Sequence, residues 1–200
     1  MKESSIGVLS VQGDVSEHVS AMRVVCKASG FDAKVSEVKT SKSLAAVDAL
    51  VFPGGESTTM GKLLREFGLE GELVERVSSG MPCLATCAGL VLLAKEGDLQ
   101  VEKTHQPLLG VLDIKVSRNA FGRQRESFEA DLDIPVLGKK PYCGVFIRAP
   151  AVDKLWGKAK SLCEYGGRIV AVRQGKIIAT SFHPELSMDG RLHEYFLNLI

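Results

Sequence analysis

The sequence has almost no net charge. Its 200 residues include 25 Lys and Arg against 24 Asp and Glu, a formal charge of +1, and no block of like charge stands out. Proteins that bind nucleic acid neutralise phosphates with clustered Lys and Arg side chains. The balance of charges supplies no electrostatic argument for such a partner, so we expect no nucleic acid among the ligands.

Long apolar runs are also missing. No window approaches the roughly 18 uninterrupted apolar residues of a membrane-spanning helix, which predicts no membrane association. The first five residues lead directly into an apolar run at residues 6–11. We therefore expect no secretory signal.

Cysteine is scarce, odd in number and scattered. These residues fit a reducing compartment better than a disulfide framework, so we expect a cytoplasmic protein. Three residues separate Cys83 from Cys87, but no second Cys or His pair completes a zinc site, and we expect no metal. The five cysteines are Cys26, Cys83, Cys87, Cys143 and Cys163.

The composition itself is that of an ordinary globular protein, 45% hydrophobic and 24% charged. Two hundred residues suffice for one domain with a sizeable core and are short for two. In the first half, apolar runs alternate with segments of helical periodicity, which predicts a parallel sheet covered on both faces. We expect strands at 6–11, 32–38, 48–52 and just before Cys87, and helices at 17–29, 43–47, 58–67 and 69–79.

The second half changes character, because strand-like segments follow one another with few helices between them. We predict a single α/β domain over residues 1–200, with a central, mostly parallel sheet and an antiparallel section in this half. Ligands of such open sheets bind at the carboxyl ends of the parallel strands. The expected elements are strands at 109–116, 127–132, 144–147, 161–165, 168–173 and 176–182, hairpin turns at 166–167 and 174–175, and a helix at 192–199.

Residues 82–90 have the pattern of a nucleophile elbow. An apolar, strand-like run ends at Cys87, the small residues Ala88 and Gly89 follow, and an apolar helical segment begins at Leu90. A sharp strand-to-helix turn of this kind exposes the side chain at its apex, and the positive end of the helix favours a thiolate. A free cysteine is also among the most buried residue types, so this segment alone leaves both roles open.

A cysteine nucleophile needs a base and a group that orients the base. His183 follows the last apolar strand, and Glu185 comes two residues later, close enough to fix the imidazole tautomer. The other three histidines, His18, His105 and His193, lie in polar or helical settings where we expect solvated or packing roles. We therefore predict a Cys87–His183–Glu185 relay.

Acyl transfer also needs hydrogen-bond donors for a developing oxyanion. Gly54 and Gly55 follow a strand, and without Cβ atoms their amides can approach a ligand closely; the amide of Ala88 is the second donor expected in elbow enzymes. Arginine forks suit a carboxylate. Composition does not separate Arg118 and Arg148 from the surface arginines Arg123 and Arg125.

Together, these segments resemble the class I glutamine amidotransferase family, and within it the glutaminase subunits of pyridoxal 5′-phosphate synthase. The cysteine elbow and the His-Pro-Glu segment point to the wider family. Residues 118–124 and 146–150 narrow the resemblance to that subunit. The match runs almost end to end, through residues 9–13, 53–58, 86–89, 118–124, 146–150 and 181–186.

The resemblance implies a flavodoxin-like three-layer fold and hydrolysis of L-glutamine to glutamate and ammonia through a γ-glutamyl thioester. Cys87 would attack the side-chain amide, His183 would shuttle the proton and Glu185 would orient His183. The amides of Gly55 and Ala88 would lie near the oxyanion. The implied glutamine-binding residues are Gly54, Gly55, Glu56, Arg118, Ile147 and Arg148.

The resemblance also implies a protein partner. The ammonia would pass to a separate (β/α)8 synthase subunit, which makes pyridoxal phosphate from a pentose phosphate and a triose phosphate. Family members are largely silent until that subunit docks, and the region of Gln12 would lie near the interface. Because the coenzyme is the product of the pathway, we expect no cofactor in this chain.

Three alternatives stay open. The glutaminase subunit of imidazole glycerol phosphate synthase has the same triad, but segment 118–124 argues against it. A DJ-1/PfpI-like chaperone or hydrolase carries an elbow cysteine, but segment 181–186 weighs against it. A catalytically dead regulatory partner of the synthase would not need an intact Cys87, His183 and Glu185.

Two features depart from the family pattern. The elbow usually has Gly where this chain has Ala85, which is tolerable if φ is negative there. Segments 101–107 and 154–160 look like extensions without an assigned role, and we expect neither to touch the triad motifs.

Overall fold

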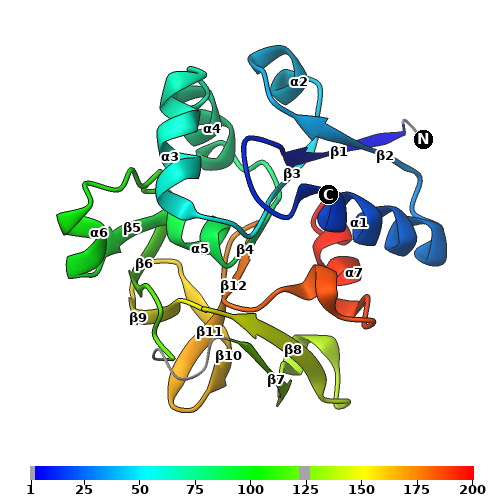
Figure 1. The fold of residues 1–200 in the computed structure, drawn as a ribbon. Coiled ribbons are helices and arrows are strands. Elements are labelled where there is room, and N and C mark those ends of the chain that lie inside the picture. The colour runs from blue at the N-terminus through cyan, green and yellow to red at the C-terminus, as the bar shows by residue number, and fades with distance from the viewer. Residues whose placement is uncertain (1–2, 122–126) are drawn as a thin grey trace.

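A ten-stranded sheet with helices on both faces organises the chain (Figure 1). The computed structural model describes residues 3–121 and 127–200. Its strands are β1 (Ser4–Leu9), β2 (Ala33–Val38), β3 (Ala49–Phe52), β4 (Cys83–Thr86), β5 (Ala94–Gly97), β6 (Leu112–Ser117), β7 (Ser127–Leu132), β8 (Tyr142–Ile147), β9 (Ala151–Leu155), β10 (Lys160–Tyr165), β11 (Arg168–Gln174) and β12 (Ile177–Thr180). Its helices are α1 (Val15–Ser29), α2 (Ser41–Ala45), α3 (Ser57–Glu66), α4 (Glu70–Ser78), α5 (Ala88–Leu93), α6 (Leu99–Lys103) and α7 (Arg191–Leu197), with 3-10 turns η1 (Pro135–Leu137) and η2 (Pro184–Leu186).

The strands of the large sheet run in the order β2-β1-β3-β4-β12-β11-β9-β6-β5, and β10 pairs with β11. From β2 to β12 every ladder is parallel. Beyond β12, strand β11 is antiparallel to β12, β9 and β10, and β9 is antiparallel to β6. The predicted α/β fold with a mostly parallel sheet and an antiparallel section in its second half is confirmed.

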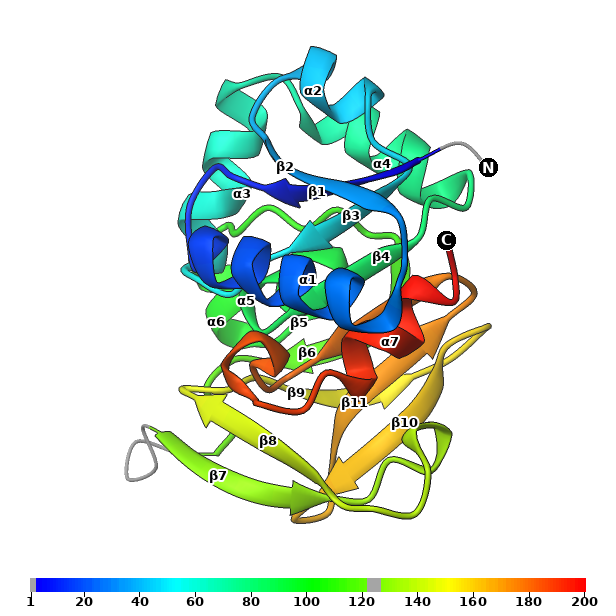
Figure 2. The ribbon, with the colours of Figure 1, turned by 90° about the vertical axis from the view of Figure 1, so that its right-hand side faces the viewer.

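Side-chain alternation along the buried strands explains the three layers. In β3, Ala49 and Val51 belong to one core cluster and Leu50 and Phe52 to the other, all fully buried. Successive strand residues point to opposite faces, so a continuous apolar run requires cover on both. Helices α1 and α7 cover one face and α2 to α5 the other (Figure 2). 

The expected elements of the first half all form, with boundaries shifted by at most two residues. Helix α1 ends where predicted, at Gly30, whose φ of 71° lets its amide bond back to the Cys26 carbonyl. In the second half the strand expected at 109–116 begins only at Leu112, and β5, α6 and β9 were not predicted. Strand β5 was missed because its four residues follow α5 directly and carry two exposed charged side chains.

Strands β7 and β8 form a separate antiparallel pair below the large sheet (Figure 2). Two hairpin turns join β10 to β11 and β11 to β12. The first lies at 166–167 as expected, and the second lies at 175–176, one residue later than expected, because Gln174 still belongs to β11. Segment 154–160 is the end of β9, a turn and the start of β10. Within the described ranges, the helices are all too short or too polar to cross a membrane.

Candidate active site

The predicted elbow is present at the carboxyl end of β4. Cys87 has φ 48° and ψ −97°, and its amide donates to the Thr180 carbonyl at 2.8 Å. A non-glycine residue at positive φ is strained, and such strain gathers at functional sites. A Cβ on Gly89 would lie 2.6 Å from the Phe52 carbonyl, so glycine lets α5 pass close to β3. Ala85 lies inside β4 and does not have a positive φ, so the turn tolerates alanine where the family usually has glycine.

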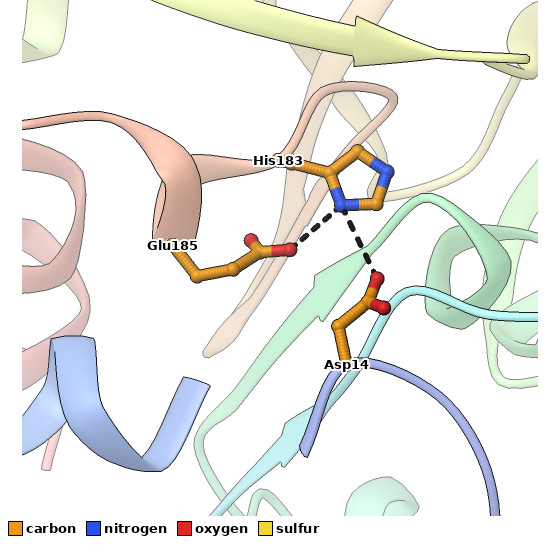
Figure 3. A group of neighbouring side chains, drawn as sticks. All are labelled: Asp14, His183 and Glu185. Atoms are coloured by element: carbon orange, nitrogen blue, oxygen red, sulfur yellow. Dashed lines mark hydrogen bonds and ion pairs between the residues drawn. The ribbon is translucent and has the colours of Figure 1, made fainter. Parts of the chain in front are cut away.

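His183 lies at the end of the neighbouring strand β12 and pairs with Glu185. Its amide donates to the Val145 carbonyl at 2.8 Å, and its Nδ1 lies 2.6 Å from Glu185 Oε1 (Figure 3). The Glu185 carboxylate accepts a hydrogen bond from the protonated Nδ1 of His183. Nε2 is therefore the ring nitrogen that can take up or release a proton. Burial alone would lower the pKa of His183, but Cys87 and Glu185 outweigh it and raise that pKa to about 10. The imidazolium form is therefore strongly favoured in this pair.

A second carboxylate lies near the same nitrogen. Asp14 Oδ2 is 3.7 Å from His183 Nδ1, and the ligand atoms of Asp14, His183 and Glu185 lie within 4.8 Å of one another (Figure 3). These residue types could hold a metal ion. However, ligand atoms at about 2.0–2.2 Å from one ion are about 3 Å or more apart, whereas Nδ1 and Glu185 Oε1 are 2.6 Å apart. The spacing of His183 and Glu185 is that of a hydrogen bond, and Asp14 lies beyond hydrogen-bond distance of the same nitrogen.

The glycine pair lies opposite the elbow. Gly55 has φ 150°, a conformation that side chains rarely adopt, and a Cβ there would lie 2.6 Å from Gln12 Oε1. Gln12 Oε1 accepts from the Glu56 amide at 2.8 Å and so ties the β1–α1 loop to this turn. A Cβ on Gly54 would lie 2.5 Å from His183 Cε1. Glycine at both positions is thus required by close packing around the imidazole and the turn.

Arg118 lies at the end of β6 and reaches the start of α3. Its Nη2 donates to Glu56 Oε1 at 3.3 Å, and its Nη1 donates to Gln106 Oε1 at 2.9 Å and to Thr58 Oγ1 at 3.2 Å. Its amide donates to Asp98 Oδ2 at 2.8 Å. Gln106 and Asp98 flank α6, so segment 101–107 does touch a predicted site residue. The expectation concerned only the triad motifs, and the contacts of this segment with Arg118 were not predicted; they arise because α6 brings Gln106 and Asp98 against Arg118.

Glu56 also begins α3. Its carboxylate accepts from the amides of Thr58 and Thr59 at 3.2 and 2.7 Å and from the Thr59 hydroxyl at 2.8 Å. Burial would raise the pKa of Glu56, but these hydrogen bonds outweigh it and lower that pKa. The carboxylate therefore stays anionic beside Arg118.

A cavity of about 420 Å³ joins these groups. The Ile147 carbonyl accepts from the Cys87 thiol at 3.9 Å, and Arg148, with φ 42°, follows it as an exposed residue at the rim. Gly54 and Glu185 do not line this cavity, but both contact the His183 imidazole. The other predicted residues all line the cavity: Gly55, Glu56, Cys87, Ala88, Arg118, Ile147, Arg148 and His183.

Some of the site was not found from the sequence. Asp14 and Asn119 line the cavity, and Gln106 holds Arg118 from outside it. Of these three residues, only Asn119 could have been predicted from the sequence, because it follows Arg118 directly in segment 118–124. Arg123 and Arg125 lie outside the described residues.

The histidines and cysteines outside the cavity differ in burial. His105 is exposed, as expected, whereas His18 and His193 are buried, so a packing role fits them and a solvated one does not. All five cysteines, which fall in the described ranges, are free. Cys83 is fully buried with its thiol donating to the Met81 carbonyl at 3.3 Å, and burial raises its pKa.

Comparison with known proteins agrees with this geometry. A subunit PdxT of pyridoxal 5′-phosphate synthase from Methanosarcina mazei is 50% identical over 98% of both chains, and one from Saccharolobus islandicus is 46% identical over the same shares. A crystal structure of a glutamine amidotransferase is 50% identical, covers 97% of each chain and superposes with a TM-score of 0.85. PurLQS from Thermotoga maritima, at 14% identity and a TM-score of 0.64 over 98% of this chain and 99% of that one, shares the fold.

These likenesses define the class of protein as a glutamine amidotransferase. Within that class, the chain belongs to the SNO glutamine amidotransferase family, whose sequence profile matches residues 8–200.

Proposed function

We propose that this chain hydrolyses L-glutamine through Cys87, His183 and Glu185 and delivers the ammonia to a pyridoxal 5′-phosphate synthase subunit. One observation carries the chemistry: the strained elbow cysteine and the histidine of a His–Glu pair line one cavity, together with an anchored arginine. The names of relatives at 46–50% identity over nearly the whole chain support the pathway.

The Cys87 thiolate attacks the side-chain amide carbon of glutamine, and the carbonyl oxygen becomes an oxyanion. Amides of Ala88 and Gly55 stabilise this charge. His183, protonated at Nε2, gives its proton to the leaving nitrogen, which departs as ammonia and leaves a γ-glutamyl thioester. His183 then takes a proton from water, whose oxygen attacks the thioester carbon. The carbon–sulfur bond breaks, which restores the Cys87 thiolate beside the His183 imidazolium, and the new carboxylic acid loses its proton to solvent and leaves as glutamate.

The cavity also offers a complementary site for the amino-acid end of glutamine. The guanidinium of Arg118 suits a carboxylate, and the anionic Glu56 suits an ammonium group. Ile147 and Arg148 also line the cavity, and the missing Cβ of Gly55 lets the substrate approach the backbone. Gly54 does not line the cavity and instead leaves room for the His183 imidazole. This assignment gives each of the six predicted glutamine-binding residues a role.

The partner is a separate (β/α)8 synthase subunit that uses the ammonia to make pyridoxal phosphate. The names of the relatives support this over the imidazole glycerol phosphate pathway. Five unpaired thiols support a cytoplasmic location. The organisation of residues 1–200 as a single domain stays a prediction.

Ammonia and glutamate release from L-glutamine tests the proposal. The chain is assayed alone and with a purified pyridoxal 5′-phosphate synthase barrel subunit, beside the Cys87→Ala variant. We expect release that depends on Cys87 and rises when the barrel is added. Folded wild-type protein that releases no ammonia in either condition would favour a regulatory partner, and release stimulated only by an imidazole glycerol phosphate synthase barrel would favour that pathway.

A further inference from the structure

A buried histidine outside the proposed triad contacts the far side of the triad carboxylate. His18 lies in the first turns of α1, on the face that the helix turns to the core with Met22, Val25 and Cys26. Its side chain is fully buried, and its Nε2 lies 3.3 Å from Glu185 Oε2. No part of the mechanism above uses this imidazole.

The surroundings of Glu185 explain why this contact matters. The Glu185 side chain has no solvent exposure, and its Oε1 faces His183 Nδ1 at 2.6 Å. Among residues 3–121 and 127–200, His18 Nε2 is the only side-chain nitrogen of a Lys, Arg or further His found within 4.0 Å of either carboxylate oxygen. A buried carboxylate oxygen without a donor is costly. His18 Nε2 and Glu185 Oε2 face each other at 3.3 Å, and among the described residues neither atom has another hydrogen-bond partner, so a small turn of the imidazole would satisfy both.

We propose that His18 is a positioning residue for glutamine hydrolysis: its Nε2–H holds Glu185 Oε2 and thereby keeps Oε1 aligned with His183 Nδ1. The inference rests on the proposed function, since it assigns His18 a part in the same relay. It extends the triad to a linear series in which His18 holds Glu185, Glu185 orients His183 and His183 exchanges protons with Cys87.

The charge state of His18 fits a neutral donor. Burial lowers its pKa to about 4; Glu185 opposes this shift, while His193 and His183 add to it. A neutral imidazole with hydrogen on Nε2 donates to a carboxylate without neutralising it. The titratable groups around the pair come from five places: Glu185 in η2, His183 after β12, His193 on α7, Tyr142 on β8 and Asp14 just before α1. Glu185 therefore keeps the negative charge that the imidazolium of His183 needs.

His193 provides a matched control within the same layer. It is also a buried histidine, with 2% exposure and a pKa lowered by burial. Among the described residues, no ion pair joins His193 to Glu185, and both its ring nitrogens are without hydrogen-bond partners. Replacing His193 removes a buried imidazole of the same size but leaves the donor to Oε2 in place.

The test compares His18→Met with His18→Gln in the complex with the synthase barrel subunit. The two new side chains have similar length, but only Gln retains an N–H donor, and Met adapts well to a core. We measure kcat and KM for glutamine and the pH dependence of kcat/KM, with thermal unfolding as the check on folding. His193→Met and Cys87→Ala are assayed beside them. If His18→Met does not fold, His18→Asn replaces it, because its amide is too short to reach Oε2.

We expect His18→Met to lower kcat about ten- to a hundredfold, the usual range for a lost outer partner of a catalytic group, with KM within twofold. The alkaline limb of kcat/KM should move to lower pH, because a Glu185 carboxylate that is no longer held against Nδ1 raises the pKa of His183 less. His18→Gln should recover most of kcat, and His193→Met should stay within twofold of wild type.

Folded His18→Met or His18→Asn with wild-type kcat and pH profile would overturn the inference, as would an equal loss in His193→Met or a His18→Gln no better than His18→Met. These outcomes differ from failure of the proposed function, in which wild-type protein itself shows no release that depends on Cys87.

Discussion

Glu185 Oε1 lies 2.6 Å from His183 Nδ1 although only Pro184 separates the two residues. Proline begins the 3-10 turn η2, and its fixed φ suits the first position of a helical turn. The turn carries the Glu185 side chain back towards the strand end that it has just left. Orienting residue and base therefore come from one short segment, and their pairing does not depend on how distant elements dock.

Glu185→Gln should lower kcat for glutamine about 10²–10⁴-fold, because an amide cannot stabilise the imidazolium and favours the wrong tautomer. The measurement is steady-state ammonia release across pH. Asp14→Asn is the matched control, since its carboxylate lies 3.7 Å from the same nitrogen but is about half exposed. A loss in Asp14→Asn equal to that in Glu185→Gln would contradict the assignment of Glu185 as the orienting residue.

Cys87 should be the first cysteine alkylated by iodoacetamide near pH 7. It borders the cavity beside His183, which stabilises the reactive thiolate. Burial raises the pKa of Cys83 and Cys163, and burial together with the Glu129 carboxylate raises that of the half-buried Cys143. Peptide mass spectrometry gives the rate at each site.

In His183→Asn the Cys87 rate should fall at least tenfold while the rates at the other cysteines stay unchanged. Faster modification of Cys143 than of Cys87 in the wild type would argue against an activated thiol at the elbow.

The sequence was informative where function depends on local geometry. Cys87, the glycine pair and His183–Glu185 each lie at the end of a parallel strand, and strand ends could be read from apolar runs. Gln106 could not be found in this way, because its contact with Arg118 depends on how the unpredicted helix α6 folds back. For His18 the sequence left a solvated and a packing role open, because its neighbours in the chain are polar, and only the fold shows that its side chain faces the core.

Gln106→Leu should raise KM for glutamine about ten- to a hundredfold and leave kcat within about threefold. The change removes an acceptor from the Arg118 guanidinium, and a hydrogen bond to a charged group contributes about 1.5–3 kcal/mol. Initial rates over a range of glutamine concentrations separate the two constants. Gln100→Leu, the same change on the exposed surface of α6, should leave both unchanged. A fall in kcat with constant KM would instead link Gln106 to the chemical step.

Acid should destabilise this protein partly through His193. Burial lowers its pKa from 6.5 to about 4, so between these values the unfolded chain binds a proton that the folded chain does not. The free energy of unfolding is therefore undiminished by His193 above about pH 6.5 and falls as the pH drops towards 4, by about 3 kcal/mol in all. Urea unfolding at pH 7, 5.5 and 4.5 measures this decline.

His193→Leu should make that decline shallower, whatever its effect on stability at pH 7, because an apolar side chain binds no proton in either state. His105→Leu changes an exposed histidine and should leave the slope as in the wild type. The same slope in the wild type and His193→Leu would mean that the buried imidazole gains its proton without unfolding, through a local opening of α7 from the sheet, and hydrogen exchange in α7 would then rise below pH 6.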